Sequence, residues 1–384
     1  MGAAHVPGAA QCVPSVLRDA RMKSFAFVFV LSLAFSAMLM PWAMRLSQRL
    51  GAMSDVGGRN VGTTSVGRLG GVGIVLGAMG AIVALLVTDS NVARLLLSRP
   101  ELLVALSVGG VAMGTLGFVD DVRRVRALIK FGVQILAGLC AYALGFRIDA
   151  VQLPFVGAID FGPFASIVTV VWIAGVVNAI NLIDGLDGLA GGIVFFAAVT
   201  NFVVGFVAGS TLASLFMAAI AGATLGFLLY NWHPAKIYMG DSGSYFLGFV
   251  LATSSLLGAA QKASTTISIL VPVLAMGVPI FDTLFAIVRR FLERRPMFSP
   301  DRGHVHHRLL DMGMTQRRVV LGLYGISILL TGVGMLVAFE RNRIVGVVII
   351  GAAVIALLLW GLSFGRRKRE EVVARRSQPD PESR

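Results

Sequence analysis

Long apolar stretches separated by short polar breaks run along most of the chain. We place eleven of them near residues 24–44, 68–88, 101–119, 128–146, 163–183, 188–208, 211–230, 243–260, 267–288, 319–338 and 344–364. Each is close to the roughly 20 apolar residues that an α-helix needs to cross a bilayer. The pattern therefore predicts an all-α polytopic membrane protein with about 11 transmembrane helices.

The composition supports this prediction and gives the domain organisation. Of 384 residues, 56% are hydrophobic and only 14% are charged, with a mean hydropathy of +0.82, outside the range of soluble domains. We expect an N-terminal tail at 1–23, a transmembrane domain at 24–364, and a charged, disordered cytoplasmic tail at 365–384.

The net charge of +13 is distributed unevenly between the two predicted sides of the membrane. The loops after the odd-numbered stretches, with the C-terminal tail, hold 24 of the 33 Lys and Arg residues, and the other side holds 9. By the positive-inside rule, the N-terminus is predicted outside and the C-terminus in the cytoplasm. The positive charge then reflects membrane topology, and we expect no nucleic-acid partner.

Six aspartates lie at the predicted cytoplasmic ends of the stretches, where acids are costly and by default mark a functional site. Together they would repel an anionic substrate, so we expect them to bind a hard divalent cation, Mg2+ or alternatively Mn2+, that bridges phosphates. Bases on the same side suit phosphate oxygens, which favours phosphoryl transfer at a cytoplasmic active site. The acids are Asp120, Asp121, Asp184, Asp187, Asp241 and Asp282, and the bases include Lys130, Arg302, His304, His306 and His307.

Two other interpretations of these residues stay open at this point. The three histidines could form a zinc site, although a structural site needs four ligands and no cysteine lies nearby. A cation-coupled transporter also has many spans and buried acids, but its acids usually lie near the midplane.

Asn178, Asn181, Asp184 and Asp187 recur every three residues, and on an ideal helix they would fan out and line a cleft.

Five short motifs on the predicted cytoplasmic side carry a family resemblance. They are Gly-Phe-Val-Asp-Asp at 117–121, Asn-Ala-Ile-Asn-Leu-Ile-Asp-Gly-Leu-Asp-Gly-Leu at 178–189, Met-Gly-Asp-Ser-Gly-Ser at 239–244, Pro-Ile-Phe-Asp-Thr at 279–283 and Asp-Arg-Gly-His-Val-His-His-Arg-Leu at 301–309. In this order and on one face they resemble the polyprenyl-phosphate N-acetylhexosamine-1-phosphate transferases of glycosyltransferase family 4. The resemblance covers about residues 45–330.

The resemblance implies an enzyme that transfers N-acetylhexosamine 1-phosphate from a UDP-sugar to undecaprenyl phosphate, releasing UMP. The motifs at 182–192 and 304–309 are more similar to the GlcNAc-1-phosphate branch than to the phospho-MurNAc-pentapeptide translocases, which remain the alternative. The first cytoplasmic loop reads Arg59-Asn60-Val61-Gly62, where this branch usually carries Lys and His. The motifs at 182–192 and 304–309 make UDP-GlcNAc the favoured donor despite this difference, with other UDP-N-acetylhexosamines behind it.

The resemblance also implies roles for individual residues. Asp241 would be the main Mg2+ ligand, with Asn181 as a second, and Asp120 and Asp121 would lie where the lipid phosphate arrives. The residues implied as catalytic are Asp120, Asp121, Asp184, Asp187, Asp241 and His306. Those implied as substrate-binding are Lys130, Asn178, Asn181, Asn231, Tyr238, Asp282, Arg302, His304 and His307.

For the reaction we favour direct attack of the lipid phosphate on the β-phosphorus of the UDP-sugar. A two-step route through an aspartyl phosphate stays open. The implied partners are a UDP-N-acetylhexosamine, undecaprenyl phosphate and membrane lipid, and a homodimer is left open. The implied location is the bacterial cytoplasmic (inner) membrane.

Overall fold

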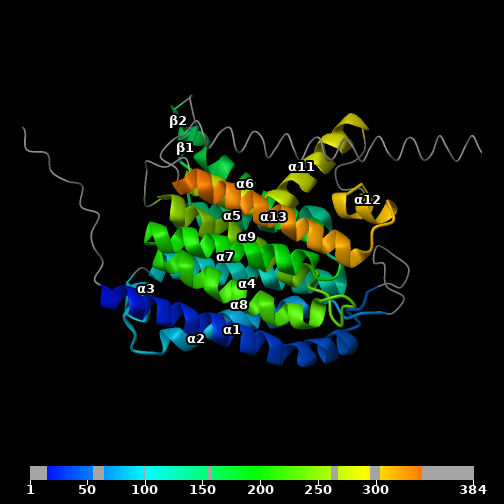
Figure 1. Ribbon diagram of the computed structural model, residues 1–384, viewed down its shortest axis with the longest axis horizontal. Coiled ribbons are helices and arrows are strands. Elements are labelled where there is room, and N and C mark those ends of the chain that lie inside the picture. Colours follow the sequence, from blue (N-terminus) through cyan, green and yellow to red (C-terminus); the bar gives the residue numbers. More distant parts are fainter. Residues whose placement is uncertain are drawn as a thin grey trace, which may run out of the picture.

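A computed structural model describes residues 15–54, 65–98, 100–153, 157–260, 267–294 and 303–339 of the chain (Figure 1). The predicted last span at 344–364, the tail at 365–384, Arg302 and the loop at 59–62 lie outside these described residues, as do residues 1–14. Within them, helices and one small hairpin account for nearly all of the ordered backbone.

The helices run roughly parallel or antiparallel in one elongated bundle (Figure 1). They are α1 Ser15–Leu50, α2 Gly70–Leu86, α3 Asn91–Leu97, α4 Pro100–Arg123, α5 Ala127–Ala143, η1 Gly162–Phe164, α6 Ala165–Ile183, α7 Leu189–Ala208, α8 Thr211–Asn231, α9 Gly240–Ala260, α10 Ile267–Ala275, α11 Gly277–Leu292, α12 Val305–Asp311 and α13 Gln316–Phe339. The antiparallel hairpin pairs β1 Ala150–Leu153 with β2 Gly157–Asp160.

Six of the described helices are long and apolar enough to cross a membrane, or seven if the bent pair α2 and α3 counts as one span. The six are α1, α4, α6 with η1, α7, α8 and α13. This confirms an all-α, multi-pass architecture, while the full number of spans and their orientation stay predictions. α1 begins at Ser15, inside the predicted N-terminal tail.

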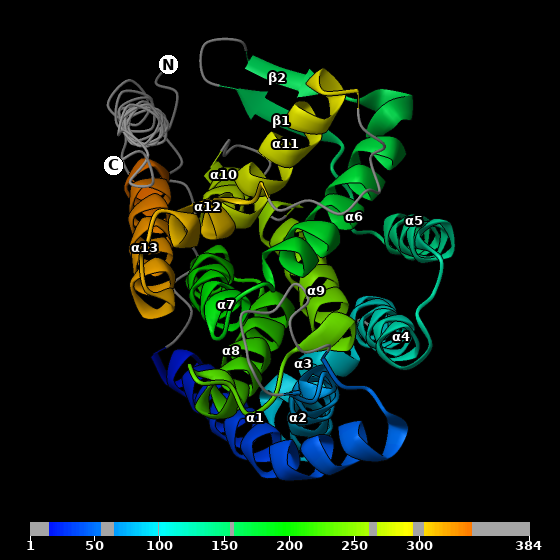
Figure 2. The same ribbon diagram turned by 90° about the vertical axis from the view of Figure 1, so that its right-hand side faces the viewer.

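The core of the bundle forms around α8 and α9. In the view along the bundle, α9 lies between α6, α7 and α4, and α8 lies between α7, α1 and α2 (Figure 2). Phe216, Phe227, Phe246 and Phe249 of these two helices are fully buried. Apolar residues all round a helix predict burial against other helices, and α8 follows that rule.

The stretch predicted as one span at 267–288 is broken, and this is a correction. α10 ends at Ala275 and α11 begins at Gly277, two residues before Pro279. Pro279 has no N–H to donate to the Ala275 carbonyl four residues earlier, which favours the break there, although Pro41 and Pro272 lie inside α1 and α10. α11 then buries Asp282 and exposes Leu284, Phe285 and Val288.

Three elements lie between the predicted apolar stretches: α3, the β1–β2 hairpin and α12. α12 carries the His-Val-His-His motif and lies at the same end of the bundle as the last turns of α4 and α6 (Figure 1). The hairpin and α3 lie at the other end (Figure 1). The chemistry-bearing motifs thus meet at one end of the bundle.

Candidate active site

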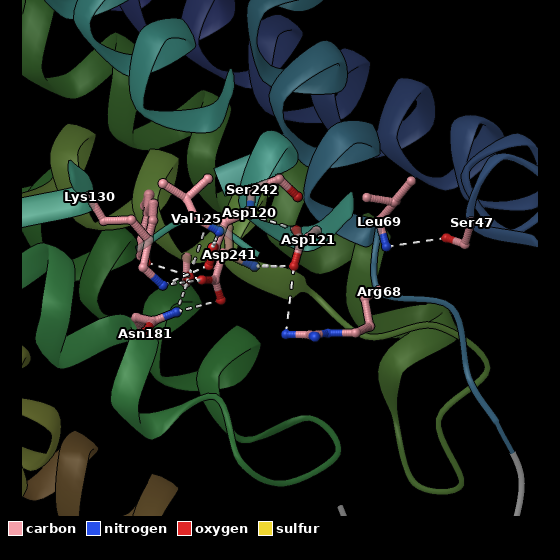
Figure 3. Close-up of polar contacts among 12 residues, drawn as sticks. Ser47, Arg68, Leu69, Asp120, Asp121, Val125, Lys130, Asn181, Asp241 and Ser242 are labelled. Atoms are coloured by element: carbon pink, nitrogen blue, oxygen red, sulfur yellow. Dashed lines mark hydrogen bonds and ion pairs between the residues drawn. The ribbon is translucent and has the colours of Figure 1, made fainter. Parts of the chain in front are cut away.

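The N-terminus of α9 is held by Asp121 from the last turn of α4. The Asp121 side chain is fully inaccessible, and its two oxygens accept hydrogen bonds from the backbone N–H groups of Asp241 and Ser242, each at 3.0 Å (Figure 3). The carboxylate therefore satisfies N–H groups that a helix start leaves without partners. Arg68 lies 3.7 Å from it, between Nη2 and Oδ1.

This junction requires glycine at position 240. Gly240 has φ +70°, and a Cβ there would lie 2.0 Å from the Arg68 carbonyl oxygen and 2.5 Å from Asp121 Oδ2. The adjoining segment pairs with residues 67–71, since Gly70 and Gly71 donate to the Tyr238 and Met239 carbonyls at 3.0 and 2.8 Å. Arg68 is placed next to Asp121 by this pairing. The sequence analysis missed Arg68, although a base at the edge of an apolar stretch was a usable signal.

Lys130 of α5 lies between two carboxylates. Its Nζ is 2.7 Å from Asp120 Oδ2 and 3.6 Å from Asp241 Oδ2 (Figure 3). Asp120 Oδ1 also accepts a hydrogen bond from the Val125 N–H at 2.6 Å, which ties the α4–α5 turn to the site. One ammonium group is thus shared by carboxylates from α4 and α9.

Asp241 receives further hydrogen bonds from α6 and from its own helix. Asn181 Nδ2 donates to Asp241 Oδ1 at 2.9 Å, and Tyr245 OH donates to Oδ2 at 3.1 Å. The same Asn181 group lies 3.0 Å from Ser244 Oγ. Sequence reasoning missed Tyr245 and Ser244. Tyr245 lies one helical turn after Asp241, a spacing that could have been used.

The turn between α6 and α7 does not continue the helix, so the four polar residues of 178–187 do not follow one helical spacing. α6 ends at Ile183, and each side chain finds a different neighbour. Asn178 donates to Gln134 Oε1 at 2.6 Å, on α5. Asp187 Oδ2 lies 2.7 Å from His233 Nδ1 and accepts from the Ala235 N–H at 3.1 Å. The helical spacing expected for these four residues does not hold beyond Ile183, because the helix ends before Asp184, and the shared cleft stays a prediction.

Asn231 is the last residue of α8, and Tyr238 lies in the connection between α8 and α9. Buried Asn231 accepts from the Gly188 N–H at 2.9 Å and donates to the Ile237 carbonyl at 2.8 Å, joining this connection to the α6–α7 turn. Tyr238 is half-buried. Burial raises the pKa of Tyr238, and the nearby carboxylates of Asp187 and Asp184 raise it further.

Asp184 is the first residue after α6, at the start of the α6–α7 turn. Burial raises its pKa to about 7, with Arg68 opposing the shift and the carboxylates of Asp121 and Asp187 adding to it. Perturbed carboxylates of this kind cluster at functional sites, and Asp184 therefore remains a candidate.

The histidines of α12 pack against the same turn. Asp282 holds the start of α12: its Oδ2 lies 2.9 Å from His304 Nδ1, and its Oδ1 accepts from the Val305 N–H at 2.9 Å. His306 is buried, and a Cβ on Gly185 would lie 2.5 Å from its Nε2. Burial, with a further contribution from the charge of His307, lowers the pKa of His306 to about 4. The His307 ring centroid is 4.4 Å from that of His306.

The structure thus brings together most of the predicted site residues in three adjoining groups. They are Asp120, Asp121, Lys130, Asn181 and Asp241; Asp184, Asp187, Asn231 and Tyr238; and Asp282, His304, His306 and His307. Asn178 bonds to α5 instead. Among the described residues, no three His, Cys, Asp or Glu side chains converge as a complete metal site. Mg2+ often takes only one or two carboxylates and completes its shell with water and substrate phosphates, so Asp241 and Asp120 with the Asn181 amide fit that ion.

Comparisons with known proteins show which proteins this chain is similar to. Residues 103–259 match the sequence model of Glycosyl transferase family 4. The chain is 36% identical over 311 residues to the probable undecaprenyl-phosphate N-acetylglucosaminyl 1-phosphate transferase of Bacillus subtilis strain 168, covering 80% of this chain and 84% of that protein.

Two further relatives extend the comparison. A decaprenyl-phosphate N-acetylglucosaminephosphotransferase of Mycobacterium tuberculosis is 37% identical over 335 residues, 81% of this chain and 82% of the relative. A phospho-N-acetylmuramoyl-pentapeptide-transferase of Desulforamulus reducens is 30% identical over 334 residues, 80% of this chain and 92% of the relative.

Proposed function

The chain belongs to glycosyl transferase family 4, and we propose that it transfers N-acetylglucosamine 1-phosphate from UDP-GlcNAc to undecaprenyl phosphate, initiating a cell-envelope glycan. The products are the lipid-diphosphate sugar and UMP. The observation that carries the proposal is the cluster of Asp120, Lys130, Asn181 and Asp241 at one end of an apolar helix bundle. Family membership sets the cation-coupled transporter aside.

GlcNAc is favoured over MurNAc-pentapeptide as the sugar. The two relatives named for N-acetylglucosamine are 36% and 37% identical to this chain, whereas the pentapeptide transferase is 30% identical. The Leu-Ile-Asp-Gly-Leu-Asp-Gly and His-Val-His-His-Arg-Leu motifs support the same branch. The translocase-type reaction is the weaker alternative.

Different site residues are proposed to bind each of the two anionic substrates, the lipid phosphate and the UDP-sugar. Lys130, shared by Asp120 and Asp241, supplies a cation next to which a lipid phosphate can dock. That phosphate is largely dianionic at neutral pH, so its oxygen can attack the β-phosphorus with little need for a base, and Asp120 acts by positioning. Tyr238 is proposed to stack on uracil, and the α12 histidines to hold the diphosphate.

Mg2+, with Mn2+ as alternative, is proposed as cofactor. Asp241 would hold it with Asn181, whose amide can present its oxygen, and Asp120 is near enough to assist. A bound Mg2+ would neutralise the charge that develops on the leaving UMP.

We place the protein in the bacterial inner membrane with this site facing the cytoplasm, where UDP-sugars are made. Loop charge supports that orientation. A homodimer is compatible with the proposal but not required by it, since every group named above comes from one chain.

The test uses membranes that contain this protein, undecaprenyl phosphate, Mg2+ and radiolabelled UDP-GlcNAc. The expected result is an organic-extractable labelled product with release of UMP. Product only from another UDP-N-acetylhexosamine would overturn the donor, and no lipid-linked product from any donor would overturn the enzyme class. UDP-sugar/UMP exchange without a lipid acceptor would contradict direct attack and favour the aspartyl-phosphate route.

A further inference from the structure

A hollow of about 480 Å³ lies at the opposite end of the bundle from the carboxylates of Asp120, Asp121 and Asp241. Residues 21–24 of α1 and residues 89–95, which include the start of α3, line it, and Figure 1 shows α3 beside the start of α1. Its volume falls within the range of about 300–1,000 Å³ typical of ligand pockets. Three bases line it: Arg21, Lys23 and Arg94.

The charge in this hollow is only partly balanced. Among the residues whose side chains the structure describes, Asp89 is the one acid that lines it, and it pairs with Arg94, Oδ1 to Nε, at 3.5 Å. Arg94 also donates through Nη2 to Asn91 Oδ1 at 3.0 Å, so its guanidinium already has two partners in the same segment. Arg21 and Lys23 have no carboxylate partner among the described residues. Two positive charges are therefore left for an external anion.

The position of the hollow fits the edge of a membrane. The apolar part of α1 begins at Phe25, directly after Lys23 and Ser24. α3 is bent by 103° from α2, so it lies across the end of the bundle, with Leu96 buried and Leu97 exposed. A short helix that lies flat with outward leucines and a basic residue is typical of the interface, which is also the depth of lipid phosphates.

We propose that this hollow binds the phosphate headgroup of an anionic phospholipid. Arg21 and Lys23 provide charge-assisted hydrogen bonds to the phosphate oxygens, and Arg94, held by Asp89 and Asn91, closes the third side. A headgroup with net negative charge matches the two unbalanced bases, whereas phosphatidylcholine brings its own cation. The site is separate from the one proposed for the reaction, because the two lie at opposite ends of α4 and α9.

Thermal melting of the purified protein in a non-ionic detergent tests the proposal. Phosphatidylglycerol should raise the Tm of the wild type by about 2 °C or more, and phosphatidylcholine should not. The double variant R21Q/K23Q should lose most of the rise. The matched control is Arg147→Gln, a base that follows α5 at the same end but does not line the hollow.

Three results would overturn the proposal: an equal rise with phosphatidylcholine, an equal loss in the Arg147→Gln protein, or an equal rise with glycerol 3-phosphate alone. The last would assign the hollow to a soluble phosphate. Native mass spectrometry gives a second readout that does not depend on Tm. R21Q/K23Q should retain one phosphatidylglycerol fewer than the wild type and Arg147→Gln, and an unchanged number would contradict the site.

Discussion

Lys130 illustrates how a single side chain sets the charge of the candidate site. Its ammonium lies 2.7 Å from Asp120 and 3.6 Å from Asp241, so two carboxylates depend on one base. Without that charge the two acids would repel each other and any incoming phosphate.

Replacing Lys130 with glutamine should therefore lower kcat by roughly 100-fold, as expected when a charge stabiliser is lost. Lys130→Arg keeps the charge and should retain part of the activity. Lys236→Gln is the matched control, an exposed base in the α8–α9 connection. Steady-state rates with UDP-GlcNAc and polyprenyl phosphate measure the effect, and wild-type turnover by Lys130→Gln would refute the role.

Asp121 has a different role from its sequence neighbour, because its side chain is inaccessible and caps α9. In Asp121→Asn, an amide NH2 would face one of the two N–H groups, leaving a buried donor without a partner. We expect a loss of about 1–3 kcal/mol in stability. Thermal melting should show a clear drop for Asp121→Asn and a smaller one for Asp120→Asn, whose main effect should be on activity. Equal melting of Asp121→Asn and wild type would contradict the capping role.

His306 gives the protein a predictable response to acid. Its folded pKa is about 4 and its ordinary value 6.5, so below pH 6.5 the unfolded chain binds more protons than the folded protein. Stability contributed by neutral His306 is present above pH 6.5 and is lost as the pH falls toward 4. Between pH 7 and pH 5 the wild type should lose about 2 kcal/mol more than His306→Gln.

Melting curves of both proteins at pH 7, 6 and 5 measure this difference. Asp184 titrates with the opposite sign, since its folded pKa is raised, but it is present in both proteins and its effect cancels. Parallel loss of Tm in the two proteins would show that His306 is not the group responsible.

At the scale of elements, α12 reaches the site through close packing against the α6–α7 turn. Gly185 leaves room for His306, since a Cβ there would come within 2.5 Å of Nε2. Because His306 is buried, its ring has little freedom to move aside. The position of the histidine motif against the α6–α7 turn thus depends on residue 185 having no Cβ.

Gly185→Ala should displace α12 and reduce activity about ten-fold or more, because a misplacement of about 1 Å at a catalytic group has large effects on rate. Gly175→Ala on α6 is the matched control, because nothing lies within 4 Å of its Cβ position. Activity per mole of folded protein is the measurement. Unchanged activity in Gly185→Ala would mean that α12 does not contribute to the reaction.

The elements that the sequence could predict are those fixed by local apolar content. The stretches at 101–119, 163–183, 188–208 and 211–230 correspond closely to α4, α6, α7 and α8. The break at Met276 was not predicted, although Pro279 was a local signal for it. The short helix α12 was not predicted because it depends on the capping of Val305 by Asp282, a contact between distant residues.

The candidate site likewise contains features that the sequence could predict and features that it could not. Asp120, Lys130 and Asp241 were predicted to gather because acids and bases at span ends share one side of a membrane. That Asp121 caps α9 and that Asn231 joins two loops could not be predicted, since each depends on tertiary pairing of separate segments. Arg68 was missed although its place at the edge of an apolar stretch was a usable signal.

At the scale of the whole molecule, the bundle separates two kinds of chemistry. One end gathers carboxylates, Lys130 and the histidines, and the other carries the basic hollow of α1 and α3. The uneven distribution of Lys and Arg predicts that the acidic end faces the cytoplasm. This arrangement suits an enzyme that joins a soluble nucleotide sugar to a lipid phosphate at one membrane surface.

The most direct test compares purified wild type, Asp241→Asn and Asp311→Asn with UDP-GlcNAc, undecaprenyl phosphate and Mg2+. Asp311 is an exposed acid at the end of α12 and serves as the matched control. Wild type and Asp311→Asn should form undecaprenyl-diphosphate-GlcNAc and UMP, whereas Asp241→Asn should form neither while remaining folded in the membrane. Product formation by Asp241→Asn at the wild-type rate would contradict the account.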